Sequence, residues 1–205
     1  MGVLSGSLTV RRYRVVGAVP DDFRERYAEA LRAYAFRPSA DPARRADTEG
    51  WVSVHNLLDA DFGSTDAWLY DHYAVFALRV DRKVLPARLV RALLEKRVAA
   101  WCAEQGRPKC PGKAREELRE AIEIDLLSRS LPRVAVHEVC WDLAGGWLLF
   151  HHLGTAANER FRTLFHRTFG LPALACTPLD LVAQAAPDLV EPLLATGGTG
   201  LGGAA

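Results

Sequence analysis

The sequence has 205 residues, of which 49% are hydrophobic and 25% are charged, and its formal net charge is +1. This composition is typical of an ordinary soluble globular protein with one sizeable core or two small ones. No run approaches the roughly 18–20 apolar residues of a membrane span, and no secretory signal begins the chain, so we expect neither a membrane protein nor an exported one.

The cysteines are widely spread along the chain, and no two of them form a CxxC pair. They are Cys102, Cys110, Cys140 and Cys176. Without an export signal, such cysteines are expected to be reduced thiols, which places the protein in the cytoplasm.

The first 81 residues predict strands and one helix. Residues 8–16 are rich in Val, Thr and Tyr and predict a strand. Pro20-Asp21-Asp22 suits a helix N-terminus, and apolar residues from Phe23 to Tyr34 give that helix one apolar face. After a loop over residues 36–48, further strands are expected at 50–53, 68–70 and 73–80.

Residues 82–131, here called the hairpin, predict two amphipathic helices broken at residues 107–112. Leu85-Pro86 precedes the first helix and Leu131-Pro132 follows the second. The apolar positions at helical spacing are Leu89, Val90, Leu93, Leu94, Val98 and Trp101 in the first helix, and Leu118, Ala121, Ile122 and Leu126 in the second.

The remaining residues predict a second β-rich half and a tail. Residues 133–143 and 147–153 read as strands around a turn at Ala144-Gly145-Gly146, and a helix follows from Thr155 to about Phe169. Residues 171–181 are expected to be extended and 182–205 to form a flexible tail. The predicted fold is α+β: β-α-β-β and β-β-α-β halves form an antiparallel-rich body, residues 1–81 and 132–181, into which the hairpin is inserted.

Catalytic and metal sites find little support in the sequence. His137, Cys140, His151 and His152 share two predicted strands but lack the ligand spacing of a zinc site, so we expect structural roles for them. A two-metal nuclease needs carboxylates that converge on metals about 4 Å apart. The acidic residues of one loop, Asp59, Asp61, Asp66 and Asp71, are scattered instead. With no GxSxG or Walker A motif either, we expect no enzyme, no cofactor and no metal.

The positive charge of the chain is concentrated in the hairpin. Between Arg82 and Arg119 there are 11 Lys and Arg against 4 Glu, a net charge of +7 in a chain of total charge +1. A charged helix face is usually just solvated, but this excess is one-sided and continues through the turn between the helices. It therefore favours a polyanion such as nucleic acid as partner.

Several motifs, taken in order, resemble the bacterial recombination-associated RdgC family over roughly residues 8–180. They are Ala35-Phe36-Arg37-Pro38, Gly50-Trp51-Val52, Lys83-Val84-Leu85-Pro86, Leu126-Leu127-Ser128-Arg129-Ser130-Leu131-Pro132-Arg133, Trp141-Asp142-Leu143-Ala144-Gly145-Gly146-Trp147-Leu148 and the 155–174 helical segment. The resemblance implies a nucleoid-associated homodimer that binds double-stranded DNA with little sequence preference and restrains RecA-dependent recombination.

In this family the paired helices form a tip that contacts the tip of the partner subunit and lies near DNA. The resemblance and the charge together give the candidate DNA-binding residues Arg82, Lys83, Arg88, Arg91, Lys96, Arg97, Arg107, Lys109, Lys113, Arg115 and Arg119. Family members continue into a further C-terminal domain, so we expect this sequence to be a short form, either a dimer joined at the tips or a monomer.

Two other functions stay open at this point. The chain could be a protein-interaction module derived from the family that no longer binds DNA. More weakly, it could be a DNA exonuclease, a label that some family members carry, although no residue pattern in the sequence supports that activity.

Overall fold

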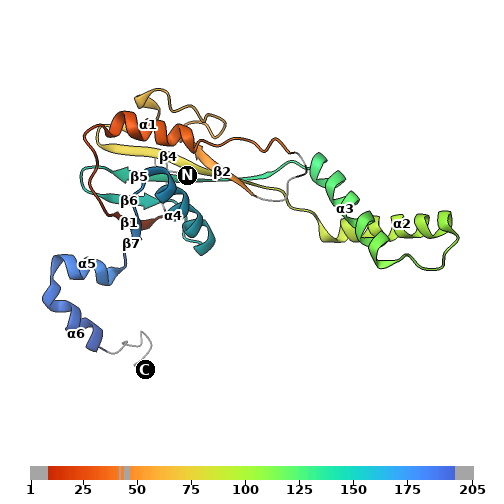
Figure 1. The fold of residues 1–205 in the computed structure, drawn as a ribbon. Coiled ribbons are helices and arrows are strands. Elements are labelled where there is room, and N and C mark those ends of the chain that lie inside the picture. The colour runs from red at the N-terminus through yellow and green to blue at the C-terminus, as the bar shows by residue number, and fades with distance from the viewer. Residues whose placement is uncertain (1–8, 42, 44–46, 197–205) are drawn as a thin grey trace. The chain divides into compact units, whose positions relative to one another are not determined.

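The structure is a computed structural model that describes residues 9–41, 43 and 47–196. Its strands form one sheet in the order β2-β4-β5-β6-β1-β7, and β3 pairs with β4 (Figure 1). The strands are β1 Arg11–Val15, β2 Thr48–Val52, β3 Leu69–Tyr70, β4 Tyr73–Arg82, β5 Arg133–Asp142, β6 Trp147–Phe150 and β7 Ala173–Ala175. The registers of β1 with β6 and β7, of β2 with β4 and of β5 with β6 are antiparallel, which confirms the predicted α+β class.

The structure describes six helices, and the first four lie where the sequence predicts helices. They are α1 Phe23–Ala33, α2 Ala87–Gln105, α3 Gly112–Arg129, α4 Thr155–Phe169, α5 Pro178–Ala185 and α6 Val190–Ala195, with short 3₁₀ turns η1 Thr65–Ala67 and η2 Pro187–Leu189. The chain divides into two compact units, unit 1 with residues 1–20, 71–74 and 139–205, and unit 2 with residues 21–70 and 75–138. This division groups the hairpin with α1, β2 and β3, so its status as a separate part stays a prediction.

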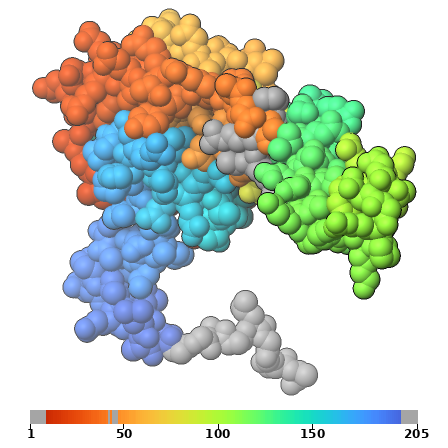
Figure 2. All heavy atoms as spheres, turned by 45° about the vertical axis from the view of Figure 1, so that its right-hand side comes forward, coloured from red at the N-terminus to blue at the C-terminus, as the bar shows by residue number. Residues whose placement is uncertain are grey.

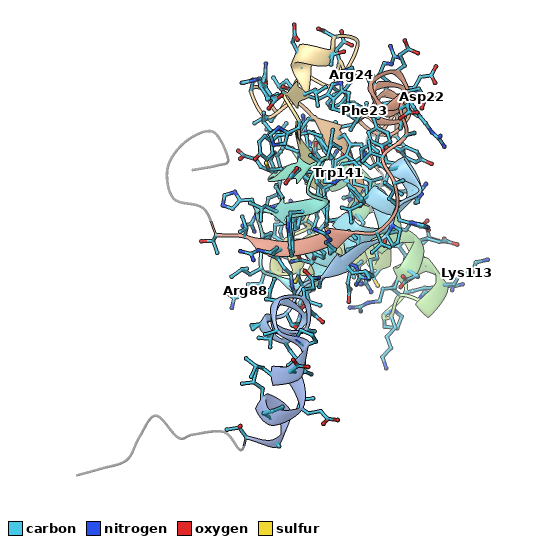
Figure 3. The ribbon with its side chains drawn as sticks, turned by 90° about the vertical axis from the view of Figure 1, so that its left-hand side faces the viewer. Asp22, Phe23, Arg24, Arg88, Lys113 and Trp141 are labelled. Atoms are coloured by element: carbon cyan, nitrogen blue, oxygen red, sulfur yellow. The ribbon has the colours of Figure 1, made fainter. Side chains whose placement is uncertain are left out.

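In unit 1, α4 packs on one face of strands β1, β5 and β6. Phe161 of α4 stacks on Phe150 of β6 with ring centroids 4.3 Å apart, and Phe165 meets Trp141 of β5 edge-on at 5.2 Å. The hydroxyl of Tyr13 in β1 donates to the side-chain oxygen of Asn158. These aromatic contacts explain why Trp141, labelled in Figure 3, and its neighbours are almost completely buried.

In unit 2, a close backbone contact accounts for two of the motifs seen in the sequence. Trp51 of β2 packs edge-on against Phe76 of β4, with ring centroids 4.9 Å apart. Phe36 donates its backbone N–H to Trp51. A Cβ added to Gly50 would lie 2.4 Å from the Cα of Phe36, so the strand needs glycine at this position.

Arg79 is the buried charge of unit 2. Its guanidinium donates to both carboxylate oxygens of Asp81, at 2.8 and 2.7 Å, and to the carbonyl of Leu57 at 2.9 Å. It also lies 4.1 Å from the ring centroid of Phe36. These partners satisfy the guanidinium inside the core, so Arg79 is a structural residue and contributes no free charge to a binding surface.

The C-terminal segment differs from what its composition led us to expect. Helices α5 and α6 occupy residues 178–185 and 190–195, where we predicted an extended segment followed by a flexible tail. A capping box between Thr177 and Asp180, with Pro178 at the first helical position, starts α5. The tail prediction is corrected as far as Ala195, and residues 197–205 lie outside the described part.

Candidate nucleic-acid interface

The hairpin has the two predicted helices, and local sequence signals set their ends. Pro86 and Pro111 directly precede α2 and α3, a position that tolerates proline because the first helical N–H groups have no partner within the helix. Gly106 ends α2 in the left-handed conformation at φ 61°. Figure 2 shows α2 and α3, in green, lying side by side.

The apolar contact between α2 and α3 is small. Four hairpin residues are buried, Val90, Leu94, Ile122 and Leu127. The other predicted positions are half-buried, except that Leu89 is 45% exposed and Ala121 is also exposed. The apolar spacing therefore marks one side of each helix, but it does not show which of its positions the neighbouring helix covers.

Two of the candidate cations, one at each side of the junction between β4 and the hairpin, form contacts within unit 2. Arg82 at the end of β4 forms a salt bridge with Asp47, at 2.9 Å, and the hydrogen bond to Asp47 raises the pKa of Arg82 above its ordinary value. Lys83 donates from Nζ to the carbonyl of Leu127 near the end of α3, at 2.7 Å. That bond satisfies one of the last carbonyls of the helix.

Two further candidates form ion pairs within their own helix. Arg91 pairs with Glu95 at 3.2 Å, and both side chains are well exposed. Arg119 pairs with Glu123 at 3.1 Å, and the Glu123 side chain is only 12% exposed. Pairs spaced i,i+4 on a helix surface contribute a few tenths of a kcal/mol and leave the guanidinium able to bind a second anion.

The other candidates are exposed, and their side chains form no hydrogen bond or ion pair with another described residue. These seven cations are Arg88, Lys96, Arg97, Arg107, Lys109, Lys113 and Arg115. Figure 3 labels Arg88 at the start of α2 and Lys113 at the start of α3. We call these residues the unpaired cations of the hairpin.

The charge of the hairpin is unequal between its two arms. Residues 82–111, which include α2 and the turn, contain eight Lys and Arg but two Glu. Helix α3 contains four Lys and Arg and five acidic residues, so its net charge is −1. The sequence count that ended at Arg119 left out Glu120, Glu123 and Asp125, and the structure places all three in the second helix. The positive excess therefore belongs to α2 and the turn.

A groove with a volume of about 510 Å³ lies between α2 and α3. Leu85, Val90 and Leu94 are its apolar lining residues, and Arg91, Arg115 and Arg119 are among its charged ones. Glu116 and Glu123 also line it, which leaves a small positive excess. Guanidinium groups beside an apolar lining can contact phosphate oxygens or the carboxylates of a protein partner.

The acidic loop has a structural explanation. Asp59 accepts a hydrogen bond from the backbone of Asp61 at 2.9 Å, and Asp61 accepts one from Gly63 at 2.8 Å. The carboxylates of Asp59 and Asp61 therefore accept hydrogen bonds from the backbone of their own turns. Over residues 9–41, 43 and 47–196 no group of three or more His, Cys, Asp or Glu side chains is placed to hold a metal ion.

The histidines and the cysteine of β5 and of the residues after β6 belong to no such group among the described residues. The Nδ1 atom of His152 accepts a hydrogen bond from the backbone of Gly154 at 2.9 Å, and burial raises the pKa of the Cys140 thiol. A raised thiol pKa opposes the thiolate that metal binding or nucleophilic attack requires. Among the helices the structure describes, none is both long and apolar enough to cross a bilayer.

Comparison with known proteins identifies relatives over most of the chain. The sequence model of the family described as "Putative exonuclease, RdgC" matches residues 10–195. A recombination-associated protein RdgC from Neisseria meningitidis is 33% identical over 120 residues, which are 58% of this chain and 40% of that protein. The RdgC protein of Laribacter hongkongensis is 34% identical over 85 residues, 42% of this chain and 28% of its own length.

A third relative, the RdgC protein of Psychromonas ingrahamii, is 30% identical over 121 residues, 57% of this chain and 39% of that protein. The matched region thus spans about two fifths of the Neisseria and Psychromonas relatives. The family match covers far more than half of this chain and includes the hairpin and the strands on both sides of it. We conclude that this chain belongs to the RdgC family.

Proposed function

We propose that this chain binds double-stranded DNA without sequence preference, associates with the nucleoid, and modulates RecA-dependent recombination or replication. The observation that carries this proposal is the set of unpaired cations, five of which lie on α2 and the turn. The relatives' printed name, recombination-associated protein, agrees with the process proposed.

The expected mode of binding is electrostatic. Lys and Arg side chains on a helix surface reach phosphate oxygens, which are the same at every base pair, so the contacts give affinity without sequence specificity. The unpaired cations can bind phosphate without breaking an intramolecular ion pair. Arg88 and Lys96 are therefore more available to DNA than Arg82, which would first have to release Asp47.

The direct test is reversal of charge on α2. Replacing Arg88, Arg91, Lys96 and Arg97 by Glu should abolish binding to random duplex DNA in a mobility-shift assay, while circular dichroism stays unchanged. Unchanged affinity at low salt would remove the hairpin from the interface.

A matched control is available on α1 and the segment after it. Arg24, Arg26, Arg32 and Arg37 are also exposed. Reversing these four residues to Glu changes the net charge by the same amount. We expect the control to retain most of the duplex affinity, and an equal loss in both variants would show a general effect of charge and not a site.

We also propose that the hairpin forms a homodimer contact. Leu89 on α2 and Ile124 on α3 are 45% and 49% exposed, and Trp101 is half-buried, so apolar surface remains after the two helices have packed. Light scattering tests this contact. The wild-type mass should be that of a dimer and should fall toward that of a monomer when Leu89 and Ile124 are both changed to Ser.

The same apolar surface favours a second candidate function, a protein-interaction module that does not bind DNA. A clean dimer or complex in light scattering, together with no shift of duplex DNA, would support that module over the DNA-binding proposal. We propose no catalytic activity. Incubating labelled duplex with the protein and Mg²⁺ should leave the DNA intact, and its degradation would favour the exonuclease named in the family description.

A further inference from the structure

The sheet of unit 1 carries a cluster of cationic, aromatic and apolar side chains on the face opposite α4. Tyr13 points toward α4, so its neighbours Arg12 and Arg14 point to the other face. The register sets Arg14 beside Trp147 and Arg12 beside Leu149 on this face. We call Arg12, Arg14, Trp147, Leu149 and the adjoining Tyr73 the aromatic–arginine patch.

Both arginines of the patch lie over the Trp147 ring. The guanidinium carbon of Arg14 is 4.8 Å from the ring centroid, and that of Arg12 is 5.6 Å away. Arg14 also donates to the carbonyl of Gly145, which fixes its position beside the turn. The side chain of Arg12 is exposed and forms no hydrogen bond or ion pair within the described chain, so its donors are available to an anion.

A groove with a volume of about 290 Å³ lies beside these groups, and its lining includes Arg12, Trp147, Leu149 and Tyr73. Tyr73 is 40% exposed and its ring lies 4.1 Å from that of His72, centroid to centroid. The one acid of the groove, Asp142, accepts a hydrogen bond from the Gly145 backbone at 2.7 Å. That bond engages one carboxylate oxygen, and the two arginines over Trp147 outnumber this single acid, so the patch as a whole carries a small positive excess.

This chemistry fits a ligand that joins flat apolar rings to a repeating negative charge. Unpaired nucleotides have that character, since each base presents a free π-face and each phosphate an anionic oxygen pair. Bases inside a duplex are stacked on one another and their faces cannot reach a protein side chain. The patch therefore suits single strands, whereas the unpaired cations of the hairpin need only phosphates.

We propose that the aromatic–arginine patch binds unpaired nucleotides of single-stranded DNA. Trp147 and Tyr73 stack against bases, and Arg12 binds a phosphate. The proposal rests on the proposed function for the type of ligand, nucleic acid, and assigns it a second surface in a different unit from the hairpin.

The test measures binding of the full chain to a fluorescein-labelled oligo-dT and to a random duplex of equal length, by fluorescence anisotropy. Trp147→Leu should weaken oligo-dT binding about 5- to 150-fold, the range that loss of a stacked base contact produces. Arg12→Ala should weaken it as well, because a phosphate contact is lost. Trp147→Phe keeps a ring and should stay close to wild type. Duplex affinity should be unchanged in all three variants.

Arg11→Ala is the matched control for Arg12→Ala. Arg11 is exposed on the same strand and carries the same charge, but its register partner Phe150 is buried against α4, so Arg11 points to the opposite face. It should leave oligo-dT binding unchanged. Equal losses in Arg11→Ala and Arg12→Ala would overturn the proposal, and so would oligo-dT binding that Arg12→Ala leaves intact.

Tryptophan fluorescence gives a second readout. Trp51, Trp68 and Trp141 are buried, but Trp101 of α2 is half-buried and lies in the hairpin, so the measurement is made in a Trp101→Phe background. In that background, quenching by oligo-dT that Trp147→Leu removes reports the patch, and quenching that persists would contradict the proposed stacking. If the proposed function is wrong, the wild-type protein will not bind duplex DNA, whereas failure of the patch proposal alone leaves duplex binding intact.

Discussion

The charge asymmetry of the hairpin predicts how steeply its affinity for duplex DNA falls with salt concentration. Five unpaired cations lie on α2 or the turn, namely Arg88, Lys96, Arg97, Arg107 and Lys109, and two lie on α3, Lys113 and Arg115. Each phosphate contact contributes about 0.9 to the slope of log K against log salt concentration. If all seven contact phosphate, the wild-type slope is about −6, and duplex affinity falls about 6000-fold between roughly 50 and 200 mM salt.

Two alanine variants separate the arms of the hairpin. Replacing the five cations of α2 and the turn should reduce the slope to about −2, so affinity would fall only about 12-fold over the same salt range. Replacing Lys113 and Arg115 should leave a slope of about −4.5 and a fall of about 500-fold. Alanine suits this test because it removes contacts without adding repulsion and is well tolerated in helices.

Fluorescence anisotropy with a random duplex, repeated at four or more salt concentrations, gives each slope. Circular dichroism of both variants checks that α2 and α3 stay folded. If the two variants have equal slopes, the asymmetry of charge has no bearing on binding. If the five-residue variant keeps the wild-type slope, DNA contacts some other surface.

Two further predictions concern the stability of unit 2. Gly50→Ala should lower the free energy of unfolding in urea by about 2 kcal/mol or more, because its Cβ would meet the Phe36 backbone. Gly112→Ala, with open space around the new Cβ, should not be destabilising, and equal losses would contradict the packing argument. Burial raises the pKa of Tyr27 to about 12, above its ordinary value of 10, so the folded state holds this proton more tightly. The protonated Tyr27 therefore contributes its full stabilisation below pH 10, and this contribution is lost as the pH rises toward 12. The urea midpoint of the wild type should fall over this pH range, and the midpoint of Tyr27→Phe should fall less.

Local signals in the sequence were enough to predict the hairpin and the order of the elements as far as α4. Leu85-Pro86 and the proline-containing break at residues 107–112 mark helix ends in the sequence, and the structure has the helix ends there. The capping box of Thr177 and Asp180 was equally readable. The glycine-rich composition begins only at Gly197, so it gives no information about the helices before it.

Contacts between distant residues could not be predicted in this way. Arg82 donates hydrogen bonds to Asp47, which is 35 residues away in the sequence, and Lys83 donates one to the carbonyl of Leu127, which is 44 residues away. Only the fold shows that these two cations are tied within the protein while Arg88 and Lys96 are not. A sequence count gives each of them the same charge, although their availability to a ligand differs.

The aromatic–arginine patch depends on strand register in the same way. Arg14 and Trp147 are neighbours because β1 pairs with β6, and neither residue stands out in its own segment. The patch and the unpaired cations also differ in chemistry, since one combines guanidinium groups with rings and the other offers charge alone. Salt should therefore weaken duplex binding more steeply than oligo-dT binding, because stacking releases no counterions. Comparing the two slopes on the wild-type protein tests whether two kinds of contact exist before any residue is changed.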